Sequence, residues 1–241
     1  MSPLQRLAWD SGFLGFPVAR LVAQELSAAA LTALLHQSRA AGIRLIYLIA
    51  DPAAAETAVV ARQAGGWLAD RKMTFTQEIA ALPVAHPIGL HAAQIVPVSV
   101  FTPQLECLAW QSGEFSRFRR DARFERHVFT DLYSQWLRAS LAGEMARVVF
   151  ASLTPEGRET GLLTLDQQGN DATIGLLAVA AEARGHGIAH QLVETAQLQA
   201  RAWGCTRLQV VTQRDNEAAC HFYTRCGFEL SREERIYHVW L

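Results

Sequence analysis

The sequence has few cysteines and almost no net charge. Its four cysteines, among 241 residues, show neither the C-x-x-C spacing of a zinc or redox site nor the density of a secreted disulfide scaffold. We interpret them as reduced, mostly buried thiols. The formal charge is −1, because 22 Lys and Arg stand against 23 Asp and Glu. No overall field would hold this chain on nucleic acid or on an anionic membrane, so an anionic ligand must be bound by local groups.

Long apolar runs and obvious metal ligands are also missing. The longest apolar runs, such as residues 45–50, are far too short to span a bilayer, and the N-terminus lacks the apolar region of a signal peptide. We therefore expect a cytoplasmic protein without a membrane or nucleic-acid partner. His186 and His190 stand four residues apart, but the H-E-x-x-H pattern is absent and a metal site needs a third ligand. We expect no metal.

What the sequence does have is a hydrophobic content of one half, enough to fill a core, and two stretches of α/β pattern. The first predicts a strand at 18–23, a helix at 27–41, a strand at 44–50, a helix at 54–64 and a strand that ends at 79. Proline and glycine interrupt residues 81–90, which we interpret as a linker. The predicted domains are an N-terminal α/β unit, 1–85, and a second domain, 90–241.

The second domain begins with alternating elements and continues as a meander. The pattern predicts a strand at 94–98, helices at 103–111 and 125–140 on either side of an Arg-rich loop, and strands at 147–153, 160–166 and 173–179. A helix at 188–203, a strand at 207–212, a helix at 217–225 and a strand at 235–241 follow. Because a β-α-β crossover joins parallel strands, we expect an α/β (α+β) fold with a mixed, mostly antiparallel sheet.

A weak internal repeat links the two parts. Residues 41–67 echo residues 203–228, with strand, short helix, glycine, aromatic residue and strand in the same order. The N-terminal unit would then be a degenerate copy of the C-terminal half of the second domain, without a glycine-rich loop. The similarity is also explained without a repeat, because any two α/β segments share this alternation of strands, helices and turn residues.

The loop between the predicted strand at 173–179 and the helix at 188–203 carries the strongest chemical signal. Gly185 and Gly187 allow positive φ and close approach of a ligand to the backbone, and Arg184 adds a fixed charge. The N–H groups of the first helical turn lack intrahelical acceptors, and the helix dipole favours an anion there. This combination predicts a diphosphate site.

Two common phosphate-binding loops do not fit this stretch. A Walker A loop would place Lys after a glycine, and neither Gly185 nor Gly187 is followed by one. A dinucleotide-binding fingerprint would carry its third glycine at position 190, where the sequence has His190.

The stretch instead resembles the GNAT acetyltransferase superfamily. Arg184, Gly187 and Ala189 match its pattern [QR]-x-x-G-x-[GA], and residues 216–228 match N-x-x-A-x-x-x-Y-x-x-x-G-F. The resemblance implies acetyl-CoA as co-substrate and a central sheet splayed at the coenzyme site. It places the coenzyme against Leu177, Ala178, Val179, Arg184, Gly185, His186, Gly187, Ile188, Ala189, Asn216 and Tyr223.

Within that resemblance two residues take catalytic roles. The backbone N–H of Leu177 would donate to the developing oxyanion, and the Tyr223 hydroxyl would protonate the departing thiolate. Asn216 is expected mainly to cap the helix at 217–225, a role compatible with contact to the pantetheine arm. The central strand carries no acidic residue or His near Leu177, so the general base stays unassigned.

The acceptor is indicated by a second set of residues. The segment 113–120 together with Phe129, Tyr133 and Trp136 resembles the TDP-fucosamine acetyltransferases, which N-acetylate the 4-amino group of a nucleotide-linked 4-amino-4,6-dideoxyhexose. Arg117, with Arg119 and Arg120, would bind phosphates, and the rings of Phe115 and Phe118 would contact the base or sugar.

Other readings stay open for this second set. The segment 113–120 is also compatible with a solvated basic loop, in an enzyme for another amine such as a peptide N-terminus. A non-catalytic acyl-CoA-binding module is disfavoured by Tyr223, because a sensor needs no general acid. The apolar end of the chain, residues 239–241, leaves a homodimer open.

Overall fold

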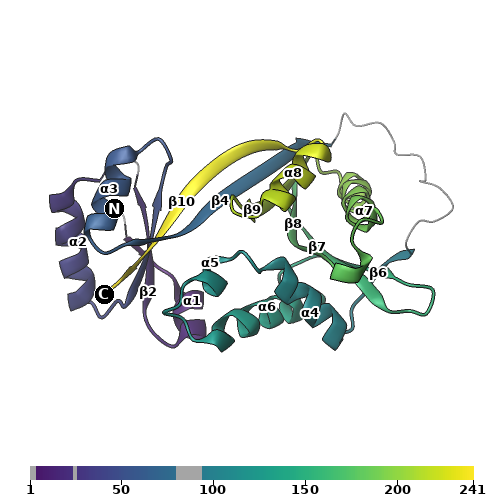
Figure 1. The fold of residues 1–241 in the computed structure, drawn as a ribbon, viewed down its shortest axis with the longest axis horizontal. Helices are drawn as coiled ribbons and strands as arrows, with labels where there is room; N and C mark the ends of the chain where they lie inside the picture. Colours follow the sequence, from purple (N-terminus) through teal and green to yellow (C-terminus); the bar gives the residue numbers. More distant parts are fainter. Residues whose placement is uncertain (1–3, 24–25, 80–93) are drawn as a thin grey trace. The chain divides into compact units, whose positions relative to one another are not determined.

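The computed structural model describes residues 4–23, 26–79 and 94–241 (Figure 1). The contacts divide the chain into two compact units. Unit 1 contains Met1–Met73, Gln213–Asp215 and Arg232–Leu241, and unit 2 contains Thr74–Thr212 and Asn216–Ser231. The predicted linker at 81–90, and with it the predicted domain boundaries at 85 and 90, lies outside the described residues.

Unit 1 is an α/β layer whose elements follow the predicted order. They are β1 (Leu4–Arg6), α1 (Ala8–Leu14), β2 (Val18–Ala23), α2 (Ala28–Ala40), β3 (Leu45–Ala50), α3 (Ala55–Gln63), the start of β4 (Trp67–Glu78) and the end of β10 (Glu229–Trp240). The sequence did not predict β1 and α1. Strands β2 and β3 are parallel, and β10 pairs with β3 in antiparallel register.

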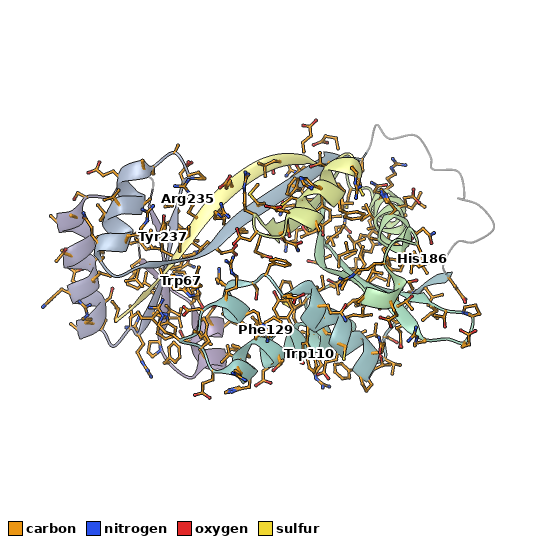
Figure 2. The ribbon with its side chains drawn as sticks, viewed as in Figure 1. Trp67, Trp110, Phe129, His186, Arg235 and Tyr237 are labelled. Atoms are coloured by element: carbon orange, nitrogen blue, oxygen red, sulfur yellow. The ribbon has the colours of Figure 1, made fainter. Side chains whose placement is uncertain are left out.

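The core of unit 1 lies between this sheet and the helices α2 and α3. Leu31 and Leu35 of α2 and Val60 of α3 are buried in one cluster with Ile46 of β3 and Tyr237 of β10. Figure 2 labels Tyr237. Alternate residues of a strand face opposite sides of the sheet, so Val239, two positions after Tyr237, shares this apolar side.

Unit 2 contains the predicted meander and the predicted crossover. Its elements are β5 (Gln94–Pro97), α4 (Pro103–Ser112), α5 (Arg117–Arg120), α6 (Arg126–Leu141), β6 (Val148–Leu153), β7 (Glu159–Gln168), β8 (Asp171–Val179), the 3-10 turn η1 (Ala181–Ala183), α7 (Ile188–Ala202), β9 (Arg207–Gln213) and α8 (Glu217–Arg225). Strands β5 to β8 pair antiparallel in sequence order, and β9 pairs parallel with β8. The prediction of a mixed sheet is confirmed.

Two long strands contribute residues to both units. The hydrogen-bonded strand order is β1-β2-β3-β10-β4-β9-β8-β7-β6-β5, with β4 between β10 and β9. The final strand begins at Glu229, six residues before the predicted start, and its end pairs with β3 from Arg235 to Trp240. For that reason the last ten residues group with unit 1, whereas the sequence suggested one domain over 90–241.

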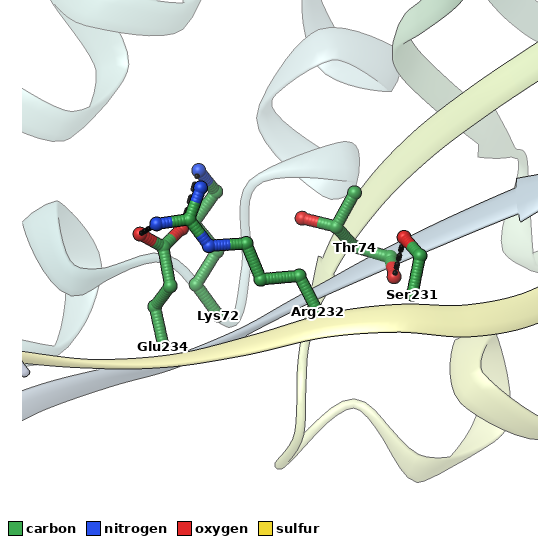
Figure 3. A network of polar contacts seen from close by, with 5 residues as sticks. All are labelled: Lys72, Thr74, Ser231, Arg232 and Glu234. Carbon is green, nitrogen blue, oxygen red and sulfur yellow. Dashed lines mark hydrogen bonds and ion pairs between the residues drawn. The ribbon is translucent and has the colours of Figure 1, made fainter. Parts of the chain in front are cut away.

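Polar contacts fasten β4 to β10 in each unit (Figure 3). In unit 1, the Glu234 carboxylate forms ion pairs with Lys72 Nζ at 3.2 Å and with an Arg232 guanidinium nitrogen at 2.8 Å. This carboxylate is almost fully buried. In unit 2, the Ser231 hydroxyl donates to the Thr74 carbonyl oxygen at 3.1 Å. The buried carboxylate is thus paired with two cations, as a charge removed from water must be.

The order of elements repeats between the units. The run β2-α2-β3-α3-β4 has a parallel first strand pair, and so has the run β8-α7-β9-α8-β10. This topology agrees with the internal repeat seen in the sequence, although descent of one run from a copy of the other stays a prediction.

Two further expectations concerned the burial of the cysteines and the absence of a helix that spans a membrane. None of the four cysteines is in a disulfide, but only Cys205 is buried and Cys107 is exposed, so the expectation of mostly buried thiols was wrong. Cys107 belongs to α4, whose buried residues Leu105, Leu108 and Ala109 lie on another side of the helix. Among the described residues, no helix is both long and apolar enough to cross a bilayer.

Candidate active site

A bulge in β8 begins the candidate site. Leu163 pairs with Leu177 and Leu165 with Ile174, so Gly175 and Leu176 of β8 stand opposite Thr164 alone. The buried Thr164 hydroxyl accepts the N–H of Leu176 at 2.8 Å. A Cβ on Gly175 would approach that same hydroxyl oxygen to 2.8 Å, which explains the glycine. Thr164 was not singled out in the sequence, because a threonine inside a strand carries no signal of this role.

We expect Thr164→Val to lower the free energy of unfolding by about 1–3 kcal/mol, because the nearly isosteric side chain leaves the buried N–H of Leu176 without an acceptor. Denaturant titration measures the effect. Thr173→Val is the matched control on β8, and we expect it to change stability by less than about 0.5 kcal/mol. Equal stabilities of the two variants would show that the bulge does not depend on this hydrogen bond.

Beyond the bulge, β8 separates from β9. The parallel pairing joins Asp171–Ile174 to Arg207–Val210, and among the described residues β8 has no partner on this side from Gly175 to Val179. The predicted splay of the central sheet is therefore present. Both strands continue past the last pair, so the separation leaves an edge of backbone N–H and C=O groups along β8.

The hydrogen bonds along β8 show which peptide groups lie on that edge. Leu176 N–H donates to Thr164 and Ala180 N–H donates to the Thr160 carbonyl oxygen at 2.8 Å, so both face β7. Since peptide groups alternate along a strand, those of Leu177 and Val179 face away from β7. Ala178 instead faces β7, so its backbone does not lie on the edge toward β9.

The edge leads directly into the predicted diphosphate loop. After η1, Gly185 and Gly187 take φ values of +82° and +79°, and Gly187 is the N-cap of α7. Within the described chain no side chain caps this helix, so its first N–H groups, starting with Ile188, are left for an external acceptor. His186 stands in the same loop (Figure 2), with Nδ1 3.3 Å from the Ala183 carbonyl oxygen.

Arg184 reaches back from this loop to β8. Its side chain is exposed, and its Nε donates to the Val179 carbonyl oxygen at 3.1 Å. The loop, the N-terminus of α7 and the open edge of β8 are thus adjoining parts of one surface. The exposed guanidinium adds positive charge where the helix dipole is also positive.

Helix α8 carries the predicted acid. Asn216 accepts the Ala219 N–H at 3.2 Å and so caps the helix, as expected. Tyr223 is 4% exposed, and its ring packs among Phe75, Phe222 and Phe228. Burial raises the pKa of the Tyr223 hydroxyl well above that of a phenol in water, so the hydroxyl keeps its proton at neutral pH.

The thiol of Cys226, at the end of α8, also stays protonated. Cys226 lies 3.5 Å from His190 Nδ1, and burial raises the pKa of the Cys226 thiol to about 11. A thiol with that pKa is protonated at neutral pH and is a poor nucleophile. Among the described residues no group of three or more metal-ligating side chains lies together.

The residues predicted to bind the acceptor lie in and just before the short helix α5. Residues 117–120 form the helical turn α5, so the prediction of an irregular loop was wrong. Arg117 lies over the Phe118 ring, 4.9 Å from its centre, and Phe118 packs at 5.4 Å against Phe124. Phe115 is half-buried just before the turn. These cation–π and ring contacts hold the basic segment in a helical turn.

A row of aromatic rings on α6 ends beside the bulge. The ring of Phe129, labelled in Figure 2, packs against Tyr133 at 5.1 Å between ring centres, and Tyr133 packs against Trp136 at 5.9 Å. A Cβ on Gly113 would lie 2.1 Å from the Tyr133 ring, so only glycine fits there. A Cβ on Gly175 would lie 3.5 Å from Trp136, which places the indole next to the point where β8 leaves β9.

The comparisons with known proteins agree with this geometry. Over 71 residues the chain is 37% identical to streptothricin acetyltransferase of Escherichia coli, covering 29% of this chain and 41% of the relative. Over 148 residues it is 31% identical to dTDP-fucosamine acetyltransferase of Escherichia coli O6:H1, covering 61% of this chain and 62% of that protein. The chain therefore spans less than two thirds of the length of either relative.

A solved structure and a family profile extend the comparison. A tandem GNAT protein from the clavulanic acid biosynthesis pathway superposes with a TM-score of 0.58 at 15% identity, over 93% of this chain and 75% of that one. At this identity the similarity shows a shared fold and nothing about activity. The profile of the acetyltransferase (GNAT) family matches residues 104–228, more than half of the chain. The chain therefore belongs to the GNAT acetyltransferase family.

Proposed function

We propose that this protein is an acetyl-CoA-dependent N-acetyltransferase. The observation that carries the proposal is the continuous surface from the unpaired edge of β8 to the uncapped start of α7 at Gly187. The peptide groups of Leu177 and Val179 would pair with the pantetheine arm, as a peptide adds to a sheet edge. The N–H groups from Gly185 to Ala189, with Arg184, would hold the diphosphate.

The proposed reaction is a direct attack by the acceptor amine. Its nitrogen forms a bond to the thioester carbonyl carbon, and the carbonyl oxygen takes negative charge beside the Leu177 N–H. Collapse of this intermediate breaks the C–S bond, and Tyr223 protonates the departing thiolate. The ammonium proton leaves to ordered water, which then restores the Tyr223 hydroxyl.

For the acceptor we propose the 4-amino group of a TDP-linked 4-amino-4,6-dideoxyhexose. Three observations support this choice. The dTDP-fucosamine acetyltransferase relative covers more of this chain than the streptothricin acetyltransferase does. The row from Phe129 to Trp136 gives an aromatic surface next to the bulge, on which the apolar face of a sugar can pack. Arg117 to Arg120 supply bidentate donors of the kind that bind phosphates.

A different small amine is the second candidate, supported by the higher local identity to streptothricin acetyltransferase. Release of free thiol from saturating acetyl-CoA distinguishes the candidates. We expect turnover with TDP-4-amino-4,6-dideoxyhexoses that exceeds turnover with polyamines, aminoglycosides and peptide N-termini by at least about a hundredfold in kcat/KM. Turnover only on the other amines contradicts the nucleotide-sugar proposal. Coenzyme binding without thiol release on any amine contradicts the enzyme proposal itself.

A further inference from the structure

Gln77, on β4, links the two helices of the coenzyme-binding half. Its Nε2 donates to the Cys226 carbonyl oxygen at 2.9 Å, and its Oε1 accepts from Gln197 Nε2 of α7 at 2.8 Å. The residue is 8% exposed. A buried carboxamide that uses both its donor and its acceptor fixes the elements it joins, because losing either bond leaves a buried polar group unpaired.

The carbonyl that Gln77 binds belongs to the turn that ends α8. Cys226 is the C-cap of this helix, and the N–H groups of Gly227 and Phe228 donate to the carbonyl oxygens of Thr224 and Tyr223, both at 3.0 Å. The C-cap carbonyl lacks a helical partner, as the last carbonyls of a helix do, and Gln77 supplies one. A Cβ on Gly227 would lie 2.8 Å from Gln77 Nε2, so glycine makes this approach feasible.

The same side of β4 also contacts the Tyr223 ring. Phe75 stands two residues before Gln77 and therefore shares its side of the strand. The Phe75 and Tyr223 ring centres lie 6.0 Å apart, and Phe75 is 4% exposed. Strand β4 thus contacts this region in two ways. Phe75 packs against the Tyr223 ring, and Gln77 hydrogen-bonds Cys226, three residues after Tyr223.

We propose that Gln77 is a positioning residue for the general acid, acting through the C-cap of α8 to set the place of the Tyr223 hydroxyl. This inference rests on the proposed role of Tyr223. No pattern in the sequence predicts this role, because Gln77 lies more than a hundred residues before α8 and precedes the predicted linker.

The test is a double-mutant cycle in steady-state kinetics with the full chain, using Gln77→Met and Tyr223→Phe. Methionine keeps the length of the side chain and removes both hydrogen bonds. We expect Gln77→Met to lower kcat by about tenfold, since small displacements of a catalytic group are costly, and to leave the KM for acetyl-CoA within about twofold. Once Tyr223→Phe has removed the acid, Gln77→Met should lower kcat further by less than about twofold.

The outcomes separate this inference from the proposed function. Equal losses from Gln77→Met with and without the Tyr223 hydroxyl overturn the positioning role and leave Tyr223 as the acid. A Tyr223→Phe enzyme with near wild-type kcat overturns the acid role and this inference with it. Gln199→Met on α7 is the matched control, with kcat expected unchanged. If Gln77→Met does not fold, Gln77→Glu repeats the cycle, because it keeps an acceptor for Gln197 and loses the donor to Cys226.

Discussion

Replacing Tyr223 with phenylalanine is expected to lower kcat by at least about tenfold, with little change in the KM for acetyl-CoA. The substitution removes one oxygen atom and keeps the ring that packs among Phe75, Phe222 and Phe228. Without that hydroxyl the thiolate would have to leave unprotonated or take its proton from water. Initial rates of thiol release at saturating acceptor measure the effect.

The chain offers a matched control for this variant. Tyr237 of β10 is also fully buried, and among the described residues its hydroxyl has no hydrogen-bond partner. Tyr237→Phe therefore deletes the same atom in a comparable setting, and kcat should stay at the wild-type value. Because burial raises the pKa of Tyr223, this phenol should remain protonated across an ordinary range of assay pH. Wild-type kcat in Tyr223→Phe would remove this residue from the chemistry.

Replacing Gly187 with valine is expected to raise the KM for acetyl-CoA by at least about tenfold, since a left-handed conformation costs an L-residue roughly 1–2 kcal/mol and a β-branched one more. Gly187 has φ +79° and is the N-cap of α7. In the described part of the chain the nearest atom to a new Cβ is Gln191 Nε2 at 4.0 Å, so there is room for the side chain. The free-energy cost of the substitution therefore comes from the left-handed backbone conformation. Relief of the strain would turn the first N–H groups of α7 away from the diphosphate.

Gly169→Val separates this local effect from a general loss of stability. Gly169 also has positive φ, +61°, and within the described chain no atom lies within 4 Å of a new Cβ. It precedes β8, at the opposite end of the strand from the diphosphate loop. Titration calorimetry with acetyl-CoA should show weakened binding in Gly187→Val and unchanged binding in Gly169→Val. Equal affinities in both variants would argue against the loop as the diphosphate site.

Local signals in the sequence predicted most of the elements. Helix α8 runs over the predicted residues 217–225, because Asn216 caps its start and Gly227 ends it. Ser27 caps α2 in the same way, accepting the Ala30 N–H. The positive φ of the glycines in the proposed diphosphate loop was also predicted, because it is a property of residue type. Signals of this kind act within one turn or one strand.

Features set by distant contacts could not be predicted. The bulge in β8 includes a hydrogen bond between Leu176 and Thr164, twelve residues apart. The helical turn α5 is held by packing such as that of Phe118 on Phe124, in a stretch whose basic composition suggested a loop. The early start of β10 and its pairing with β3 join parts of the chain that are nearly two hundred residues apart.

The placement of β4 also has a consequence for the extent of unit 2. The coenzyme-binding half draws Phe75, Gln77 and Ile79 from the N-terminal side of the chain, where Ile79 donates to the Thr206 carbonyl oxygen and accepts from Arg201 Nε. Removing residues 1–79 would leave β9 paired with β8 alone and would take β3 from the end of β10, so the remaining residues would not keep this sheet. Residues 74–79 are therefore part of the framework of unit 2, although they precede residues 104–228, which match the family profile.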